Sequence, residues 1–335
     1  MSDDLESILD SVAGTYEPEL PEYDGTLPPL LQDLSYSSLG ELHSCARKFV
    51  LNKLRAPFRA DTRSVTFAFG HAVGAGIQSV LTYESHQDWS EEQKWNHVVL
   101  DMLLQWDFDD IYAEEEKAGK SFWNAIIAVQ RFKHIRNSAI LQEYELLWIG
   151  ERPATELSFR ITTPDGYKYR GFVDVVLKHK LTGELLVLEL KTTSSTRIEA
   201  ATYKNSGQAL GYSVVLDNLA PGKSSYRVLY LVLSSKELEY TPLEFTKNYL
   251  QRAEWIHSFL LDIEIIKLYH ANNFWPQNGA SCFNFFRECE HFQTCGLKLE
   301  NQVPPKSWVM ESQDDNEYSI ELSLMDLIET QLDRE

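Results

Sequence analysis

Residues 170–193 read RGFVDVVLKHKLTGELLVLELKTT, and this stretch decides the fold. Its two halves are strongly apolar, and Thr182-Gly183 between them is typical of a hairpin turn. The pattern predicts two antiparallel strands, Tyr167–Leu177 and Glu184–Lys191. Within the apolar segments 171–177 and 185–191, the charged residues are Asp174, Glu189 and Lys191. Because a buried charge is costly unless it is paired or binds a metal ion, these residues are the first candidates for a functional site.

The spacing of the charged residues favours a metal site. Glu189 and Lys191 are two residues apart on one strand, so their side chains point to the same face, and the short hairpin lets Asp174 approach them. Two carboxylates suit a hard cation such as Mg²⁺ or Mn²⁺. Such a cation activates a water and stabilises charge on a scissile phosphate, while Lys191 orients or deprotonates that water. The alternative is a Glu–Lys pair on the solvated face of an edge strand.

The segments around the hairpin predict a mixed α/β fold rather than a parallel repeat. Ser35 or Ser37 is expected to cap the first helix. Apolar spacing predicts helices over about 35–49, 70–83, 91–116, 122–145, 198–216 and 246–270. Period-two patterns predict two further strands, Ala154–Thr162 before the hairpin and Tyr226–Leu233 after it.

The negative charge is concentrated at the two ends of the chain. The formal net charge is −19. Residues 1–30 hold eight acids and no Lys or Arg, and residues 309–335 hold nine acids and one Arg. The remainder has 33 acids and 30 bases. Net charge therefore does not exclude a local basic groove for nucleic acid.

The start of the chain lacks the basic region and apolar stretch of a signal peptide, and no apolar run approaches the ~20 residues that span a bilayer. We therefore expect a cytoplasmic protein that does not contact a membrane, in a bacterium or in the host cytoplasm if a phage encodes it. In that compartment the four cysteines are expected to be thiols or metal ligands rather than disulfides.

The order of the motifs resembles the PD-(D/E)XK nuclease superfamily, and most of all its branch with the RecB and AddB nuclease domains and the CRISPR-associated adaptation exonucleases. That branch has Gly-x-x-Asp, then Glu-x-Lys, then Gln-x-x-x-Tyr. The matching residues are Gly171-Phe172-Val173-Asp174, Glu189-Leu190-Lys191 and Gln208-Ala209-Leu210-Gly211-Tyr212. The resemblance covers about residues 35–300. It implies that Gln208 and Tyr212, one helical turn apart, face the active site and DNA.

Two further residues are expected at the metal site from the resemblance. Glu156, on the strand before the hairpin, lies where many relatives carry an additional acid; the alternative is a solvent-facing strand residue. Relatives also show Gly-x-x-x-His on an early helix. Here the corresponding segment is Gly70-His71-Ala72-Val73-Gly74, with glycine at the expected histidine position. His71 is about one turn away and either substitutes for that histidine or packs in the core.

The cysteines are divided between two places in the chain. Cys45 precedes the predicted core, and Cys282, Cys289 and Cys295 follow it. Several members of the branch use such a division to ligate a 4Fe–4S cluster, so the resemblance implies a cluster here. Four thiolates also suit Zn²⁺, but the paired Cys-x₂₋₄-Cys spacing of structural zinc is missing. Four unconnected thiols are the third possibility.

The resemblance implies a PD-(D/E)XK core with a helical N-terminal subdomain and a cysteine-ligated C-terminal segment. The expected parts are a flexible acidic arm (1–32), a helical subdomain (33–150), the nuclease core (151–240), a C-terminal helix with the iron–sulfur segment (241–303) and an acidic tail (304–335). The implied activity is metal-dependent hydrolysis of DNA, most often exonucleolytic processing of ends in recombination, repair or phage replication. A structure- or sequence-selective endonuclease and a non-catalytic scaffold are the alternatives.

Short amphipathic stretches occur in both acidic ends. Leu5, Ile8 and Leu9 lie at helical spacing near the start, and Leu322, Met325, Leu327 and Ile328 near the end. Such segments can order in a partner's apolar groove, so the tails are expected to recruit a recombination or single-strand-binding protein. The alternative is a tail that only increases solubility.

Overall fold

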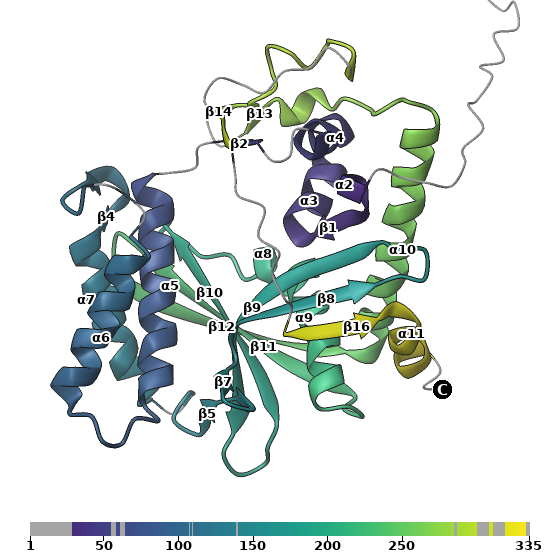
Figure 1. Cartoon of the computed structure of the whole chain (residues 1–335). Coiled ribbons are helices and arrows are strands. Elements are labelled where there is room, and N and C mark those ends of the chain that lie inside the picture. The colour runs from purple at the N-terminus through teal and green to yellow at the C-terminus, as the bar shows by residue number, and fades with distance from the viewer. Residues whose placement is uncertain are drawn as a thin grey trace, which may run out of the picture.

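We describe a computed structural model of the chain (Figure 1). The described residues are 29–54, 58–60, 64–106, 108, 110–138, 140–284, 287–299, 308–310 and 319–332. The expected helix around Leu5, Ile8 and Leu9 lies outside these residues.

A mixed sheet forms the centre of the molecule. Its main strands are β8 (Thr155–Thr162), β9 (Lys168–His179), β10 (Leu185–Thr193), β11 (Ser225–Ser234), β12 (Glu239–Asn248) and β16 (Ile320–Ser323). They lie in the order β12-β11-β10-β9-β8-β16, and β1 (Asp33–Ser35) and β5 (Tyr144–Leu146) also pair with β9. The β10–β11 pair is parallel, whereas β8–β9, β9–β10 and β11–β12 are antiparallel. This arrangement confirms the predicted mixed α/β fold.

Helices cover both faces of the sheet (Figure 1). On one face are α5 (Val65–Tyr83), α6 (Glu91–Leu104) and α7 (Phe122–Arg136); on the other are α9 (Gly207–Leu219) and α10 (Tyr249–Ala271). Buried side chains of β10 alternate between two apolar clusters: Leu186 and Leu188 belong to the cluster of α5–α7, and Val187 to the cluster of α9 and α10. The almost continuous apolar character of β10 follows from this burial on both faces.

The remaining elements are short. The helices are α2 (Pro29–Gln32), α3 (Tyr36–Ser44), α4 (Ala46–Leu54), α8 (Ala201–Lys204), η1 (Glu116–Ala118), η2 (Gly279–Ser281) and α11 (Leu324–Leu332). Small strand pairs join β2 (Phe58–Ala60) to β15 (Trp308–Met310), β3 (Glu114–Glu115) to β4 (Lys120–Ser121), β6 (Trp148–Ile149) to β7 (Arg152–Pro153), and β13 (Phe283–Asn284) to β14 (Arg287–Glu288).

The first expected helix is two helices. Ser35 caps α3 as predicted, and its side chain accepts a hydrogen bond from the Ser38 amide. The chain then takes an extended conformation at Cys45 before α4 begins. Apolar periodicity alone did not reveal this break, because both helices bury residues against the same core cluster.

Several predicted helices are shorter than expected. The helix predicted over 91–116 ends at Leu104, and the one predicted over 122–145 ends at Arg136, because the following residues form a loop and then β5. The helix predicted over 198–216 is divided into α8 and α9. The helix predicted from Thr246 begins at Tyr249 with Asn248 as its cap, because residues 239–248 form β12, a strand that the sequence analysis missed.

Helix α5 is long and apolar enough to cross a membrane by length and composition alone. The expectation that no apolar run approaches the length of a membrane span was therefore wrong for this helix. Half of its apolar window is buried within the protein. Phe69, Ala72, Val73 and Ile77 pack in the cluster shared with α6, α7 and the sheet. Packing against the sheet accounts for this apolar composition.

The expected acidic tail, 304–335, contains part of the core. Residues 320–323 form β16, which pairs in parallel with β8, and α11 follows directly. Leu322, Leu324 and Leu327 are buried. The amphipathic pattern noted in the sequence is therefore satisfied by the chain's own sheet, which corrects the expectation that these residues order on a partner.

Replacing Leu324, which is 1% exposed, tests this placement. We expect Leu324→Ala to lower the free energy of unfolding by about 2–5 kcal/mol, because it removes buried apolar surface and leaves a cavity. Urea denaturation of the full chain measures the effect. Met325→Ala is the matched control, since Met325 is 46% exposed and its loss should change stability by at most about 0.5 kcal/mol. Equal effects of the two substitutions would contradict the packing of α11.

Candidate active site

The site lies where β9 and β10 separate. Their antiparallel ladder ends at the pair Val175–Leu188, one residue before Asp174 and Glu189 would face each other. Beyond this point the Leu190 amide donates to Asp174 Oδ2 at 2.8 Å, so a side chain takes the place of a ladder hydrogen bond. In Figure 1, β10 runs toward α5 while β8 and β9 turn toward α10. The opening of the sheet exposes the edge on which the two carboxyls lie.

Glu189 is a buried carboxylate with unsatisfied oxygens. Its side chain is 1% exposed, and neither oxygen has a hydrogen-bond partner among the described residues. Lys191 Nζ lies 2.7 Å from Glu189 Oε1, so the Lys191 ammonium already compensates part of this charge. A buried carboxylate in this state has room for a further positive partner.

The electrostatics of the two acids point in the same direction. Burial raises the pKa of Asp174 well above its usual range, and the charge of Glu189 raises it further. Burial also raises the pKa of Glu189, against the lowering effect of Lys191. Burial is the largest cause of both shifts, and the charge of a neighbouring acid adds to each: Glu189 for Asp174, and Glu156 for Glu189. A cation bound between them would offset this repulsion.

Lys191 remains a cation in this environment. Burial lowers the pKa of Lys191, but the neighbouring Glu189 carboxylate outweighs it and the pKa is raised overall. Of the two roles that the sequence allowed, orienting or deprotonating a water, the raised pKa favours the first. A protonated ammonium donates hydrogen bonds and attracts a phosphate, but it cannot accept a proton.

Helix α9 connects to this charge pair through a polar chain. Lys191 Nζ donates to Gln208 Oε1 at 3.1 Å, and Gln208 Nε2 donates to the Tyr212 hydroxyl at 2.7 Å. Burial raises the pKa of Tyr212, so its hydroxyl stays neutral. The predicted i, i+4 pair thus lies on the face of α9 that contacts the strand residues.

Glu156 lies across the sheet from Asp174. The β8–β9 register pairs Thr155 with Val175 and Leu157 with Val173, which places Glu156 opposite Asp174. Glu156 has a φ of 45°, a left-handed conformation that is strained for a residue with a side chain. Its Oε1 accepts a hydrogen bond from Gln78 Nε2 of α5 at 2.7 Å. Two acids at opposed positions repel each other, which is typical of a site that binds a positive group.

A cleft of about 360 Å³ opens over these residues between α5 and the sheet. Asp174, Glu156 and His71 all line it, so the three candidate metal ligands outside β10 share one hollow. His71 is exposed and lies on α5 one turn before Gly74, which also lines the cleft. This position places His71 on the surface of the cleft rather than in the core.

The donor set suits a hard divalent cation. Carboxylate oxygens of Asp174 and Glu189 lie at the opening of the sheet, and both Glu189 oxygens are unsatisfied. Among the described residues, no three Asp, Glu, His or Cys side chains are already close enough to hold a metal ion together. Binding would therefore draw Glu156 or His71 toward the two acids, or use water for the remaining positions.

Comparison with known families assigns the fold to a class of enzymes. The family model of the PD-(D/E)XK nuclease superfamily matches residues 33–296, which is most of the chain. The chain belongs to the PD-(D/E)XK nuclease superfamily. Among solved structures, one from Eubacterium rectale described as a candidate exonuclease has 11% sequence identity and a TM-score of 0.46, covering 88% of this chain and 96% of that chain. No curated protein matches the chain.

The sequence analysis of this PD-(D/E)XK protein missed Gln78. Gln78 donates to Glu156 and also reaches the Asp174 carbonyl oxygen at 3.4 Å, so it ties α5 to both acids. A signal was present, because Gln78 is four residues after Gly74 and therefore on the same helix face. Its polar side chain on an apolar helix marks the side that faces the cleft.

The four cysteines come from two distant parts of the chain that meet beyond the sheet. The Ser44 carbonyl accepts hydrogen bonds of 2.8 Å from both Asn278 and Ser281, and Arg47 Nε donates to the Cys295 carbonyl at 3.2 Å. These contacts fix the break at Cys45 against the segment that carries Cys282, Cys289 and Cys295. All four cysteines are half-buried thiols without a disulfide.

The repulsion between Asp174 and Glu189 predicts a stabilising substitution. A carboxyl whose pKa is raised by folding is destabilising when ionised, and this cost disappears as pH falls toward the ordinary pKa. In EDTA at pH 8, Asp174→Asn should therefore unfold at higher urea than the wild type, and the difference should shrink toward pH 5. The Asn oxygen can still accept from Leu190. A less stable variant at pH 8 would contradict the assigned repulsion.

Asp165→Asn is the matched control with the opposite sign. Although burial raises the pKa of Asp165, hydrogen bonds from Thr163 and Lys267 outweigh it and lower the pKa overall. Its ionised form is thus stabilising, and this contribution is lost as pH falls. Asp165→Asn should be less stable than the wild type at pH 8, with a difference that also shrinks on acidification.

Proposed function

We propose that this protein is a DNA nuclease that hydrolyses phosphodiester bonds with a divalent metal ion bound at Asp174 and Glu189. The observation that carries the proposal is the buried Glu189 carboxylate, which lies beside a second acid, Asp174, with Lys191 at 2.7 Å as its cation. Membership of the PD-(D/E)XK superfamily supports a nuclease and a divalent metal such as Mg²⁺. Mn²⁺ suits the same oxygen ligands.

In this proposal Asp174 and Glu189 are the principal ligands, and Glu156 and His71 complete or adjust the site. Gln78 holds Glu156 in position. The metal ion, when bound, supplies positive charge that stabilises the scissile phosphate in the transition state. The strained, left-handed backbone conformation of Glu156 supports a functional role for its side chain, because such strain is common at functional sites.

Lys191, Gln208 and Tyr212 act together on the substrate side. The Lys191 ammonium orients the attacking water and offsets charge on the phosphate. Gln208 fixes the position of Lys191, and Tyr212 fixes the amide of Gln208, through the two hydrogen bonds described above. Both side chains come from the first two turns of α9.

We further propose that the enzyme is an exonuclease of the RecB/AddB-like branch that processes DNA ends in recombination, repair or phage replication. The motif order Gly-x-x-Asp, Glu-x-Lys and Gln-x-x-x-Tyr supports this branch. A structure- or sequence-selective endonuclease on the same fold is the alternative activity. A non-catalytic scaffold is less consistent with the structure, since Asp174 and Glu189 are costly to keep buried without a catalytic role.

A 4Fe–4S cluster is proposed at Cys45, Cys282, Cys289 and Cys295, with Zn²⁺ as the alternative. The contacts of Ser44 and Arg47 with the C-terminal segment support a common site, since they hold the turn at Cys45 against the segment that carries the other three cysteines. The thiols would have to move closer to ligate one group, because no three of them already form a metal-binding cluster among the described residues. The cluster would join the two ends of the enzyme and hold α3 and α4 in place.

Recruitment of a recombination or single-strand-binding protein is now proposed for the N-terminal arm alone, because residues 320–332 pack on the enzyme's own sheet. The acidic character of residues 1–30 supports a protein partner rather than DNA as the ligand of the arm. We propose the cytoplasm as the location.

The direct test uses end-labelled single- and double-stranded DNA, linear and circular, with Mg²⁺ or Mn²⁺ and with EDTA. We expect cleavage that requires the metal and a free end. Asp174→Ala, Glu189→Ala and Lys191→Ala should each reduce the rate by about 10²–10³-fold or more, because each removes stabilisation of the transition state. DNA binding in EDTA should be retained.

Lys178→Ala is the control for Lys191→Ala. Lys178 is an exposed residue of β9 near the turn of the same hairpin, so its loss should leave cleavage unchanged. Normal activity in a folded Asp174, Glu189 or Lys191 variant would remove that residue from its proposed role. Cleavage of circular DNA at the same rate as linear DNA would favour the endonuclease.

The cluster has its own test. Protein purified without oxygen should be brown and contain about four irons per chain, as four cysteine ligands imply. Cys289→Ser should lose the colour and lower the melting temperature, since the cluster closes a long loop between Cys45 and Cys282. A colourless protein that carries one zinc per chain would establish the alternative.

A further inference from the structure

A cavity of about 450 Å³ lies at the end of α5 away from the active-site cleft. It is bounded by the C-terminal ends of α5 and α7, the first half of α6 and the turn that follows β9. Its volume is within the range of small-molecule pockets, roughly 300–1,000 Å³. The proposed catalytic residues do not line it.

The cavity is basic although the protein is acidic. Its charged lining residues are the cations Lys94, Lys133, Arg136 and Lys180 and the acids Glu84 and Glu91. Glu91 is shared between two of the cations, at 3.6 Å from Lys94 and 3.3 Å from Lys133, and its side chain is 76% exposed. An exposed carboxylate that serves two lysines is easily displaced by a stronger anion.

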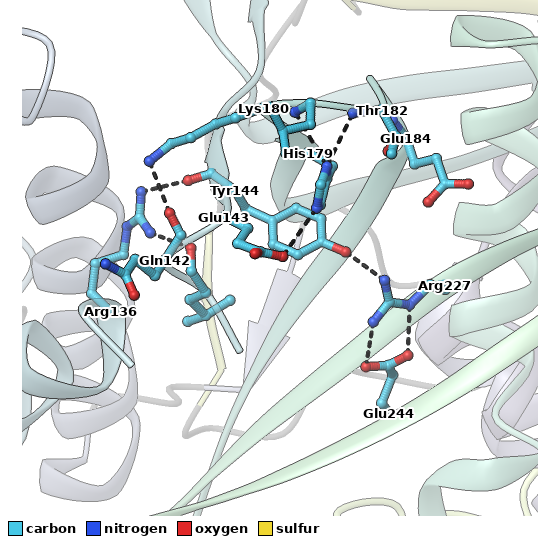
Figure 2. Close-up of polar contacts among 12 residues, drawn as sticks. Arg136, Gln142, Glu143, Tyr144, His179, Lys180, Thr182, Glu184, Arg227 and Glu244 are labelled. Atoms are coloured by element: carbon cyan, nitrogen blue, oxygen red, sulfur yellow. Dashed lines mark hydrogen bonds and ion pairs between the residues drawn. The ribbon is translucent and has the colours of Figure 1, made fainter. Parts of the chain in front are cut away.

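Two of the cations, Arg136 and Lys180, donate hydrogen bonds to the protein. Arg136 has a side chain that is 7% exposed and donates to Glu84 at 2.9 Å and to the Tyr144 carbonyl at 2.7 Å. Lys180 Nζ donates to the Gln142 carbonyl at 2.8 Å, and no carboxylate pairs with it in the described part of the chain. Figure 2 shows the Arg136 and Lys180 side chains reaching the same loop. The charge of the buried Arg136 is thus fixed before any ligand binds, whereas the exposed Lys180 can turn toward an anion.

Aromatic surface adjoins these charges. Trp95 and Tyr83 both line the cavity, and Lys133 Nζ lies 5.6 Å from the centroid of the Trp95 ring. A ligand that joins an anionic group to a planar ring could place the anion beside the lysines and stack the ring on Trp95 or Tyr83. A nucleotide unit of DNA has this chemistry, since a phosphate is joined to a base that stacks on aromatic rings.

The cavity and the active-site cleft lie along the same helix, α5, with a third hollow between them. A hollow of about 320 Å³ between them shares Tyr83 with the cavity and Gln78 with the cleft. Ten residues of α5 separate Gly74 in the cleft from Glu84 at the cavity, which is about 15 Å. A stacked strand advances ~3.4 Å per nucleotide, so this distance corresponds to about four nucleotides.

We propose that the basic cavity binds a phosphate group of the same DNA strand that is cut at Asp174 and Glu189. The cavity holds the strand about four nucleotides from the scissile bond and so positions it along α5. This role rests on the proposed nuclease function, because the phosphate would belong to the DNA strand that the enzyme cuts. A free nucleotide carries the same chemistry, and the experiment below separates the two sources.

The test measures binding of a fluorescein-labelled single-stranded oligonucleotide by anisotropy in EDTA, so that cleavage does not contribute. The double variant Lys94→Gln with Lys133→Gln should bind about tenfold or more weakly, since two charge-assisted contacts are lost. Glu91→Gln should bind more tightly, because it removes the competing carboxylate. This gain in affinity cannot result from misfolding.

Lys168→Gln is the matched control. Lys168 is an exposed residue at the start of β9, twelve residues and roughly 40 Å along the strand from Lys180, and its loss should leave affinity unchanged. Wild-type affinity of the double variant for both the oligonucleotide and dAMP, or an equal loss in the control, would overturn the cavity as a phosphate site. If dAMP binding falls in the double variant while oligonucleotide binding does not, the DNA source is overturned and a free nucleotide replaces it.

The two proposals fail separately. If wild-type protein cleaves DNA but the cavity variants bind like wild type, the cavity proposal falls and the nuclease stands. If the cavity variants change oligonucleotide binding in EDTA but the wild type cleaves no DNA with Mg²⁺ or Mn²⁺, the nuclease falls and the phosphate site stands.

Discussion

The structure depends on the end of the β9–β10 ladder, where Asp174 and Glu189 are held together away from water. The apolar strands on either side fix the two acids at the centre of the sheet, where Glu189 is buried and Asp174 is half-buried at the wall of the cleft. Lys191 and the Leu190 amide offset only part of their charge. This incomplete compensation is the physical reason to expect a cation, and the cleft beneath α5 reaches the pair at Asp174, which lines it.

The surrounding layers maintain this opening. Helices α5 to α7 cover one face of the sheet and carry His71 and Gln78 to the cleft, whereas α9 covers the other and carries Gln208 and Tyr212 to Lys191. The sheet is closed at its far edge by β16, which is the last strand in sequence and pairs with β8. Residues from nearly the full length of the described chain therefore pack around β9 and β10, the two strands that carry Asp174 and Glu189.

Local pattern was enough for the hairpin and its charged residues, because alternation, turn residues and costly buried charges are all visible in the sequence. It failed where tertiary contacts decide. The exposure of β12 alternates from Thr241 to Asn248, but this edge strand contains Pro242, and Lys247 occupies its buried position, so it does not look like a strand in sequence. β16 looked like an acidic tail because its partner β8 is more than 150 residues away. Gln78 was missed because its role depends on Glu156, which only the fold brings near.

Metal binding by the protein itself tests whether Asp174 and Glu189 form a divalent-cation site, without any assay of cleavage. Calorimetric titration of the protein with Mn²⁺ should show a site that is lost in Glu189→Gln and retained in Lys178→Ala, with the thermal stability of the wild type increased by the metal. Equal Mn²⁺ binding by the wild type and Glu189→Gln would contradict the assignment of the site.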